Sequence, residues 1–381
     1  MIAQLHSVYS LNEPNDLHRH ISVMDDFDSM VLCESISPKD YGRRPDIYSF
    51  SNSRNYRVAG HPIVNRIFRN IYRALRDNFY ADAIKENKVS VIHAHFGQVG
   101  ADIADLAKRL DIPLVVTFYG VDISRLVKEK RWIKAYQRMF EVKGRFIVLC
   151  EEAKARLERI GCPSKKIRVA DCLNDLAPFA YKERKPGAHV KLLITARFVE
   201  KKGYPILFEA MSMLLAKGRD IRLTVIGYGN EAQKRTLSGH IQRFGLQERV
   251  KVIDTADKGI DFLKVFKGSA DTHDIFVMPS ITAKNGDDEG GPALTLVNAQ
   301  AAGMPVIATH FPGAERTVFD GETGIYCRAG DAASLAEKIE YLIQNPGLWN
   351  VMGKKASEFV NENLSLDKEI SNIISIYKKL L

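Results

Sequence analysis

The chain has 381 residues, 45% of them hydrophobic and 27% charged, and a net charge of +9, which is typical of a globular protein of two domains. No apolar run approaches the roughly 20 residues of a membrane span and no signal-peptide pattern is present, so neither is expected. The five scattered cysteines favour reduced thiols in a cytoplasmic protein over a disulfide framework or a metal site.

Short β-branched runs alternate with helical patterns through the first half of the chain. The runs predict strands over residues 2–6, 30–33, 89–93, 114–118, 145–149 and 167–170. The helical patterns between them predict helices that include residues 62–86, 99–110 and 151–160. This alternation is typical of βαβ units and predicts a parallel sheet covered by helices on both faces.

The helix predicted over residues 62–86 is basic and amphipathic. Its arginines lie at steps of three, four and three along one side: Arg66, Arg69, Arg73 and Arg76. The other side is apolar, which suits attachment to an anionic surface, here the inner face of the membrane. The alternative is a core-packed helix with a solvated cationic face. Nucleic acid is not expected as a partner, because no binding motif or aromatic interleaving accompanies the charge.

A polar segment, residues 181–188, contains Pro-Gly and is interpreted as a linker between domains. Beyond it a second alternating series predicts strands over residues 190–195, 222–226, 250–253, 275–278 and 306–308. The predicted fold class is therefore α/β, with two doubly wound domains and a cleft between them. The domains are predicted to be residues 1–180 and 181–365, and a last helix, 366–381, is compatible with either. Ligands are expected at the carboxyl ends of the strands.

Residues 289–303 combine a carboxylate, a Gly-Gly-Pro turn and an Ala/Leu-rich helical run. Pro292 suits the first helical position, so the amides of residues 293–295 are expected to point out of the helix start. Such an end binds phosphate, and Glu289 beside it can accept hydrogen bonds from hydroxyls. This pairing suits a sugar nucleotide, although the same pattern also describes a well-capped helix.

Cations follow the strand predicted over residues 190–195. Arg197 and Lys202 are expected to project toward the ligand, whereas Lys201 is expected to be solvated. Fixed cations stabilise the negative charge that a departing diphosphate gains when a sugar–phosphate bond breaks. The alternative is that both are ordinary loop cations.

Two patterns raise the question of a metal. His93 and His95 end a strand two residues apart and so face one side, but no third ligand is apparent. Asp26 and Asp28 form a D-x-D pattern, which sits between a helix and a strand. Neither pattern is expected to bind a metal.

Five motifs then occur in an order that is specific as a combination: residues 196–203 (ARFVEKKG), 223–229 (LTVIGYG), 274–280 (DIFVMPS), 289–292 (EGGP) and 302–309 (AGMPVIAT). The order resembles family 4 glycosyltransferases, which are retaining enzymes of the GT-B fold with two facing Rossmann-like domains. The resemblance is strong over residues 190–330 and fainter before. There, residues 92–97, 115–122 and 146–152 are similar to family strand ends and cleft loops.

The resemblance implies a role for individual residues. Arg197 and Lys202 would hold the donor diphosphate, and Glu289 would contact the hydroxyls of the transferred sugar. Further residues would bind the donor: Gly227, Gly290, Gly291, Pro292, Ala293, Leu294, Thr295 and Asn298. Residues of the first domain would line the cleft near the acceptor: His95, Gly97, Tyr119 and Asp122. The alternatives are a packed or capping role for His95 and a helix-start role for Asp122.

Three positions depart from the family pattern. A second glutamate usually follows the first by eight residues, but Val297 is there and Asn298 comes next, whose amide binds a ribose hydroxyl less strongly than a carboxylate does. Tyr119 stands where many members have histidine. A bulkier loop, residues 7–14, replaces the usual glycine-rich loop after the first strand.

The function expected is retaining transfer of a hexose-type sugar from a nucleotide sugar to a hydroxyl of a glycan or lipid-linked acceptor, in cell-surface polysaccharide synthesis. The sequence does not distinguish uracil, guanine or adenine as the base; a UDP-sugar is the first expectation, with no metal or other cofactor. The alternatives are a GT-B sugar-nucleotide epimerase or phosphorylase, and a non-catalytic GT-B partner protein.

Overall fold

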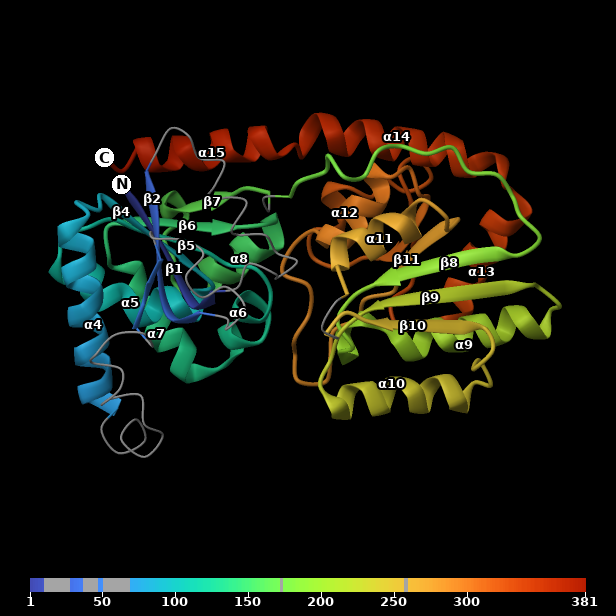
Figure 1. The fold of residues 1–381 in the computed structure, drawn as a ribbon, viewed down its shortest axis with the longest axis horizontal. Helices are drawn as coiled ribbons and strands as arrows, with labels where there is room; N and C mark the ends of the chain where they lie inside the picture. The colour runs from blue at the N-terminus through green and yellow to red at the C-terminus, as the bar shows by residue number, and fades with distance from the viewer. Residues whose placement is uncertain (10–27, 37–46, 51–68, 172–173, 257–259) are drawn as a thin grey trace. The chain divides into compact units, whose positions relative to one another are not determined.

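The computed structural model describes residues 1–9, 28–36, 47–50, 69–171, 174–256 and 260–381 (Figure 1). The chain forms two compact units: unit 1 is Met1–Leu173 together with Asp367–Leu381, and unit 2 is Asn174–Leu366. Each unit is built on one parallel sheet flanked by helices. Among the helices that the structure describes, none is both long and apolar enough to cross a membrane.

Unit 1 contains a seven-stranded sheet with the order β3-β2-β1-β4-β5-β6-β7, in which each strand pairs with its neighbours in parallel. Its strands are β1 (Ile2–Tyr9), β2 (Ser29–Ile36), β3 (Ile47–Ser49), β4 (Val91–His95), β5 (Leu114–Thr117), β6 (Gly144–Val148) and β7 (Ile167–Val169). Its α-helices are α4 (Arg69–Glu86), α5 (Gly97–Arg109), α6 (Val121–Ser124), α7 (Lys130–Phe140), α8 (Glu151–Arg159) and α15 (Leu366–Lys378), the last beginning at the final residue of unit 2.

The two faces of this sheet differ in character. Successive residues of a strand point to opposite faces, so Ala3 and Leu5 of β1 join the apolar core shared with α4, α5 and α7. Gln4 lies between them in sequence and faces α15, where its amide nitrogen contacts the Tyr377 hydroxyl at 3.2 Å. One face is therefore a dry core and the other carries buried polar groups.

Helix α15 completes unit 1 from the far end of the sequence. The Glu369 carboxylate accepts a hydrogen bond from the amide of Asp171 at 3.0 Å. Tyr377 is fully buried against β1 and β4. Of the two placements open to this helix, packing on the N-terminal unit is the one observed.

The predicted basic stripe of α4 is only partly a surface feature. Arg76 is 5% exposed and makes ion pairs with Asp102, with Asp77 at 2.7 Å and with Glu34 at 3.1 Å. The charge of Arg76 is therefore buried in unit 1 and paired with carboxylates. This corrects the prediction that Arg76 belongs to a solvated cationic face. The reason is that α5 places a carboxylate opposite this turn of the helix.

The neighbouring arginines are accounted for differently. Arg73 is exposed and also pairs with Asp102. Arg66 and the side chain of Arg69 lie outside the described residues. On the side predicted to be apolar, Ile71 is 52% exposed. The stripe is thus rotated about the helix relative to the prediction, and two of its cations have carboxylate partners.

Unit 2 contains a six-stranded sheet with the order β10-β9-β8-β11-β12-β13, again parallel throughout its described pairs. Its strands are β8 (Val190–Thr195), β9 (Ile221–Gly227), β10 (Val250–Asp254), β11 (Ile275–Met278), β12 (Val306–Thr309) and β13 (Ile325–Cys327). Its α-helices are α9 (Tyr204–Ala216), α10 (Glu231–Arg243), α11 (Phe262–Ala270), α12 (Leu294–Ala301), α13 (Ala332–Gln344) and α14 (Gly347–Asn363).

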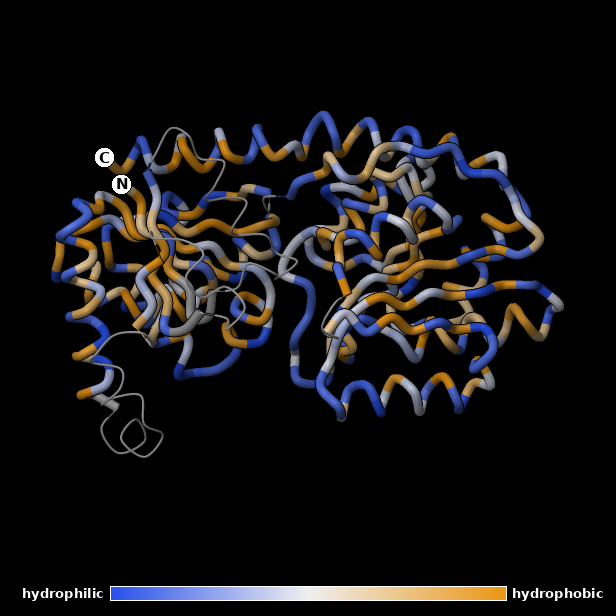
Figure 2. The backbone as a smooth tube through the Cα atoms, viewed as in Figure 1, coloured by the Kyte–Doolittle hydropathy of each residue, from blue (hydrophilic) through white to orange (hydrophobic). Residues whose placement is uncertain are grey.

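Both faces of the second sheet are apolar. Leu192 and Ile194 of β8 pack with α9 and α13, while Leu193 packs with α11 and α12. A strand buried on both sides reads as a continuous apolar run, which is why β8 is evident from the sequence. Figure 2 shows the apolar segments gathered in the strands and the polar ones along the outer helices. The predicted α/β class with two doubly wound parallel sheets is confirmed.

The strand order of unit 2 indicates a candidate ligand site. The chain order runs outward from β8 to β10 and then returns to continue from β11, so β8 and β11 flank the point where the winding changes direction. In open parallel sheets, ligands bind beyond the carboxyl ends of the strands at this switch point. The loops after Thr195 and Met278 therefore form the candidate site.

The segment 181–188, predicted to be a linker between domains, is part of unit 2. Arg184 is 6% exposed, and its main chain exchanges two hydrogen bonds with the Asn350 side chain, at 2.7 and 2.9 Å. The division between the units falls before Asn174. The segment is exposed except for Arg184, which anchors it to unit 2.

Candidate active site

The loop after β8 contains the short 3₁₀ helix Glu200–Lys202 and then Gly203. Gly203 has a φ of 68°, a conformation that residues with a side chain rarely adopt. A Cβ at this position would lie 1.9 Å from the carbonyl oxygen of Pro279. The glycine therefore allows the loops after β8 and β11 to touch.

A buried ion pair joins these two loops. Lys202 Nζ lies 2.6 Å from Glu289 Oε1, and the Ser280 hydroxyl donates to the same oxygen at 2.9 Å. Lys202 is 9% exposed and Glu289 is 8% exposed. Two of the residues expected to act on the donor are thus in direct contact at the switch point.

The charge state of this pair follows from its surroundings. Burial alone would raise the pKa of Glu289, but attraction to Lys202 and Lys201, with hydrogen bonds from Lys202 and Ser280, lowers it to about 2. Burial lowers the pKa of Lys202, and the negative charge of Glu289 opposes that effect. Glu289 is therefore ionised at neutral pH and acts as a hydrogen-bond acceptor only, which suits binding of hydroxyls.

Lys201 is not the solvated residue that the sequence indicates. It is 3% exposed, its Nζ donates to the Asp288 carbonyl at 2.6 Å, and it lies 3.2 Å from Asp287 Oδ1. A second interaction between the same loops is therefore made by the neighbour of Lys202. The 3₁₀ turn explains this, because it directs consecutive side chains into the loop that follows β11.

Arg197 occupies a different environment from the lysines. It lies two residues beyond the end of β8 and is exposed. Its positive charge is close enough to contribute to the lowered pKa of Lys202. The exposed guanidinium of Arg197 lies in the same loop as the buried Lys202 and is accessible to a ligand.

The start of α12 lies next to Glu289 in sequence. The helix begins at Leu294, two residues later than the start predicted at Pro292, and Ala293 is its N-cap residue. No side-chain cap hydrogen bond forms there, and the Ala293 carbonyl accepts from the amides of Leu296 and Val297. The first amides of the helix, Leu294 and Thr295, have no carbonyl partner within it.

Close packing holds this turn against its neighbours. Gly290 and Gly291 are buried, and a Cβ on Gly313 would lie 2.4 Å from the carbonyl carbon of Gly291. The Thr295 hydroxyl donates to the Thr195 carbonyl at 2.8 Å, which ties the helix start to the end of β8. The phosphate-binding amides predicted from the sequence therefore sit on a rigid support.

Two predicted donor-binding residues have structural roles of their own. A Cβ on Gly227 would lie 1.9 Å from the carbonyl oxygen of Ala196, so the close approach of these two chains requires glycine. Asn298 is 7% exposed, and its Oδ1 accepts a hydrogen bond from the Asn174 side chain at 2.7 Å. Val297, at the position of the second family glutamate, is 2% exposed in the apolar core.

In unit 1, His95 is held by hydrogen bonds at both ring nitrogens. Its Nδ1 lies 2.7 Å from the Tyr119 hydroxyl, and its Nε2 lies 2.8 Å from Gln4 Oε1. Because Gln4 Oε1 can only accept, Nε2 carries the proton and Nδ1 accepts from Tyr119. His95 is thus a buried ring that orients Tyr119.

The His93 ring stacks on the His95 ring, with the ring centroids 4.3 Å apart. Its Nδ1 is 2.6 Å from the Tyr377 hydroxyl and its Nε2 is 2.8 Å from the Thr117 hydroxyl. Within the described part of the chain no cluster of three metal-ligating side chains occurs, and Asp26 of the D-x-D pattern lies outside it. The two histidines belong to a hydrogen-bonded network between the sheet and α15.

Asp122, predicted to line the cleft near an acceptor, is instead completely buried. Its carboxylate accepts hydrogen bonds from the amides of Gly97 at 2.9 Å, Gly120 at 2.8 Å and Tyr119 at 3.1 Å. Burial raises the pKa of Asp122, and these amides oppose that effect. Asp122 therefore fixes the loops after β4 and β5 and places Tyr119 and Gly97.

Replacement of Asp122 by alanine is expected to lower the free energy of unfolding by about 3 kcal/mol, because one buried and two partly buried amides lose their acceptor. Chemical denaturation followed by circular dichroism measures this. Asp82→Ala, at an exposed site on α4, is the matched control and is expected to change stability by less than about 0.5 kcal/mol. Equal effects of the two substitutions would contradict this role of Asp122.

Two contributors were missed from the sequence. Ser280 ends the motif at residues 274–280 and donates to Glu289, so its place directly after a buried strand was the available signal. Tyr377 lies far from any motif, and no local pattern indicates its contacts with His93 and Gln4.

Comparison with known proteins gives a consistent result. The family model described as Glycosyltransferase Family 4 matches residues 24–176, and the one described as Glycosyl transferases group 1 matches residues 179–359. The structure of HepE from Anabaena in complex with UDP and glucose superposes with a TM-score of 0.77 over 100% of both chains, at 16% identity. The two units with their switch-point loops define a protein of the GT-B class.

Curated relatives are also similar in sequence. WcaL of Salmonella typhimurium, provisionally named a colanic acid biosynthesis glycosyltransferase, is 31% identical over 253 residues, which is 65% of this chain and 60% of WcaL. The amylovoran biosynthesis glycosyltransferase AmsK of Erwinia amylovora is 33% identical over 248 residues, 64% of this chain and 58% of AmsK. The aligned region therefore spans about three fifths of each relative. The chain belongs to the family 4 glycosyltransferases, which confirms the resemblance found in its sequence.

Proposed function

We propose that the protein transfers a hexose-type sugar, with retention of configuration, from a nucleotide sugar to a hydroxyl of a glycan or lipid-linked acceptor. The observation that carries the proposal is the buried Lys202–Glu289 pair beside the uncapped start of α12, at the switch point of unit 2. A fixed carboxylate for sugar hydroxyls and free amides for phosphate are the two features that a nucleotide sugar requires.

In this proposal each group has a distinct part. The α12 amides and the exposed guanidinium of Arg197 stabilise the charge that develops on the departing diphosphate. Glu289 accepts hydrogen bonds from hydroxyls of the transferred sugar, and Lys202 holds the carboxylate ionised and in place. A β-phosphate oxygen takes the proton of the acceptor hydroxyl on the same face, and no metal enters the reaction.

The named relatives and the thiols support the biological setting. WcaL and AmsK are named for the synthesis of two polysaccharides, which supports a role in cell-surface polysaccharide assembly. HepE binds UDP, which supports a UDP-sugar as the donor. Cys33, Cys162 and Cys327 are buried free thiols, as expected for the reducing cytoplasm.

Contact with an anionic membrane surface is a weaker part of the proposal. It depends on the arginines of residues 41–68, because Arg73 and Arg76 are already paired with carboxylates. Sedimentation with vesicles that contain anionic lipids, compared with neutral vesicles, tests it directly. Equal sedimentation with both vesicle types would contradict it.

A thermal-shift screen against UDP-, GDP- and ADP-sugars tests donor binding. At a concentration about 100 times Kd, the correct donor is expected to stabilise the folded state by about 2.7 kcal/mol, a shift of roughly 5–10 °C. The positive donor is then incubated with candidate acceptors, and the anomeric configuration of the product is read by NMR.

Each outcome of that screen separates the competing functions. An α-linked product from an α-linked donor supports the proposal. Release of free nucleotide and sugar without an acceptor product favours the epimerase type. No shift with any nucleotide sugar would favour a non-catalytic partner protein, in line with the buried Val297 and the bonded Asn298 where the family has its second glutamate.

A further inference from the structure

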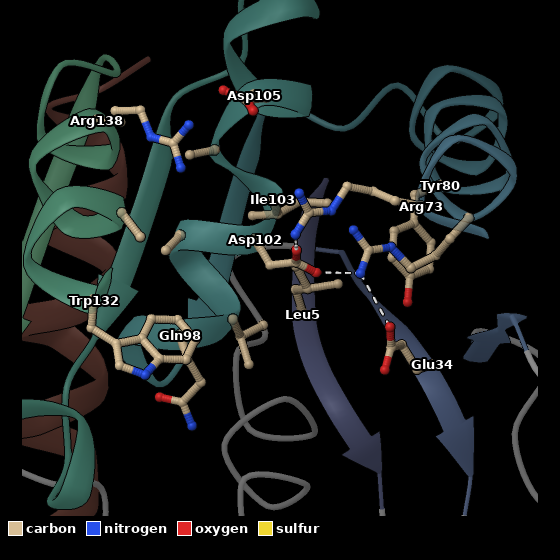
Figure 3. A pocket seen from close by; sticks show the side chains of 15 residues that line it. Leu5, Glu34, Arg73, Tyr80, Gln98, Asp102, Ile103, Asp105, Trp132 and Arg138 are labelled. Carbon is tan, nitrogen blue, oxygen red and sulfur yellow. Dashed lines mark hydrogen bonds and ion pairs between the residues drawn. The ribbon is translucent and has the colours of Figure 1, made fainter. Parts of the chain in front are cut away.

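A pocket of about 310 Å³ lies in unit 1, on the face of the sheet opposite α15 (Figure 3). It is lined by residues of α4, α5 and α7 and by Leu5 and Glu34 of β1 and β2. It is separate from the His93–His95 network, which faces the other side of the same strands. Pockets that hold small ligands measure about 300–1,000 Å³, so this one has room for a mono- or disaccharide.

The pocket collects polar atoms that have no partner in the protein. Among the described residues seven buried side-chain nitrogen or oxygen atoms make no hydrogen bond, and three of the seven belong to residues that line this pocket. They are Tyr80 Oη, Gln98 Oε1 and Trp132 Nε1. Tyr80 is only 1% exposed. Buried polar groups are nearly always satisfied in folded proteins, so this concentration points to a ligand that supplies the missing partners.

The charges around the pocket balance. Three arginines face three carboxylates: Arg73, Arg76 and Arg138 against Glu34, Asp102 and Asp105. The buried Arg76 already pairs with Asp102 and Glu34. A phosphate or another anion therefore gains no net attraction and meets carboxylates. The lining favours an uncharged ligand.

The orphaned atoms also define the hydrogen bonds that the ligand makes. The indole of Trp132 can only donate, and Gln98 Oε1 can only accept. Figure 3 shows these two side chains at one end of the pocket. A hydroxyl group accepts from one and donates to the other, and a second hydroxyl satisfies Tyr80. An uncharged molecule with several hydroxyls on a small ring has this chemistry.

We propose that this pocket of unit 1 binds an uncharged saccharide unit through Tyr80, Gln98 and Trp132. The binding does not depend on the proposed transfer reaction and is measured without a donor. Its failure would therefore leave the proposed function untouched, and failure of the transfer reaction would leave this site untouched.

The two tryptophans of the chain give a direct assay. Trp132 has an orphaned indole nitrogen, whereas Trp349 is 1% exposed and donates to the Leu342 carbonyl at 2.8 Å. The full chain labelled with ¹⁵N shows two indole N–H signals, which Trp132→Phe assigns. D-glucose, D-galactose, D-mannose and lactose are titrated singly, with inorganic phosphate as the anionic comparison. At least one sugar is expected to shift the Trp132 signal and leave that of Trp349 in place.

Two tyrosine variants provide a matched pair. Tyr80→Phe is expected to weaken sugar binding about tenfold, through loss of one hydrogen bond. It is also expected to keep or raise the melting temperature, because the hydroxyl it removes has no partner in the protein. Tyr204→Phe removes a hydroxyl that donates to the Ala196 carbonyl at 2.8 Å, so it is expected to lower the melting temperature and leave sugar binding unchanged.

Three results would overturn the proposal. The first is that no sugar shifts the Trp132 signal. The second is that phosphate shifts it and the sugars do not, since the site would then recognise an anion. The third is that Tyr80→Phe binds the sugar as the wild type does.

Discussion

The Glu289→Gln variant is expected to transfer sugar about 10²–10³-fold more slowly than the wild type at saturating donor. Glutamine has nearly the same shape, but it replaces a fixed negative charge with a neutral amide. The amide turns either an oxygen or an NH₂ group toward the sugar hydroxyls and toward Lys202, which lies 2.6 Å from the carboxylate. Product formation under multiple-turnover conditions measures the loss.

The same variant has a distinct effect on stability against pH. The folded-state pKa of Glu289 is depressed from 4.5 to about 2, so its contribution is present above about pH 4.5 and is lost as the pH falls toward 2. This contribution corresponds to about 3 kcal/mol. The difference in unfolding free energy between wild type and Glu289→Gln is therefore expected to shrink between pH 5 and pH 2. A difference that stays constant over this range would contradict the ionised pair.

A double-mutant cycle separates activity from folding. Lys202→Met alone leaves a buried carboxylate without its cation and is expected to destabilise the protein by about 3–5 kcal/mol. Both side chains are buried, so neither single substitution is expected to leave the stability unchanged. The double variant Lys202→Met with Glu289→Gln is expected to be more stable than the sum of the single effects indicates. This double variant is expected to be folded but inactive, so it is the control that separates loss of activity from loss of folding.

Replacement of Arg184 by leucine is expected to destabilise unit 2 by about 3–5 kcal/mol. The guanidinium donates to four backbone carbonyls: those of Lys182 at 2.6 Å, Ala270 at 2.7 Å, Ala302 at 3.0 Å and His273 at 3.1 Å. Leucine fills part of the space but satisfies none of these oxygens. The arginine therefore connects its own segment, near the start of unit 2, to the ends of α11 and α12.

Calorimetry measures this effect as a shift of the unit 2 transition, expected to be about 10 °C. Lys185→Leu is the matched control, because it is the exposed neighbour of Arg184 and carries the same charge. It is expected to change the free energy of unfolding by less than about 0.5 kcal/mol. Should both substitutions lower the transition equally, the loss of one positive charge rather than the carbonyl contacts would be the cause.

The strands were predictable where burial dictates their composition. A strand such as β8, enclosed by helices on both faces, must be apolar throughout, and its sequence shows this. Strands β3 and β13 are three residues long and give no pattern of their own. Their positions at the sheet edges are set by pairing with β2 and β12, which is tertiary information.

Residues of the candidate site were predictable where the backbone conformation restricts which residue types can occur. Glu289 and the glycines after it were identified because a turn into a helix limits the residue types. The assignment of Lys201 to solvent failed, since consecutive lysines look alike until the 3₁₀ turn directs both inward. Arg184 was likewise interpreted as a linker residue. Its guanidinium donates to carbonyl groups far away in the sequence, and no pattern in the neighbouring residues indicates this.

The return of α15 to unit 1 has a consequence for biosynthesis. The side chains of Gln4 and His93 find their partner in Tyr377, which leaves the ribosome only after all of unit 2 has been made. During translation this polar face of the first sheet therefore stays open to water until α15 is made, whereas all the described strands of unit 2 have already been synthesised. Unit 2 is expected to mature first, and the N-terminal unit to be the one that chaperones hold.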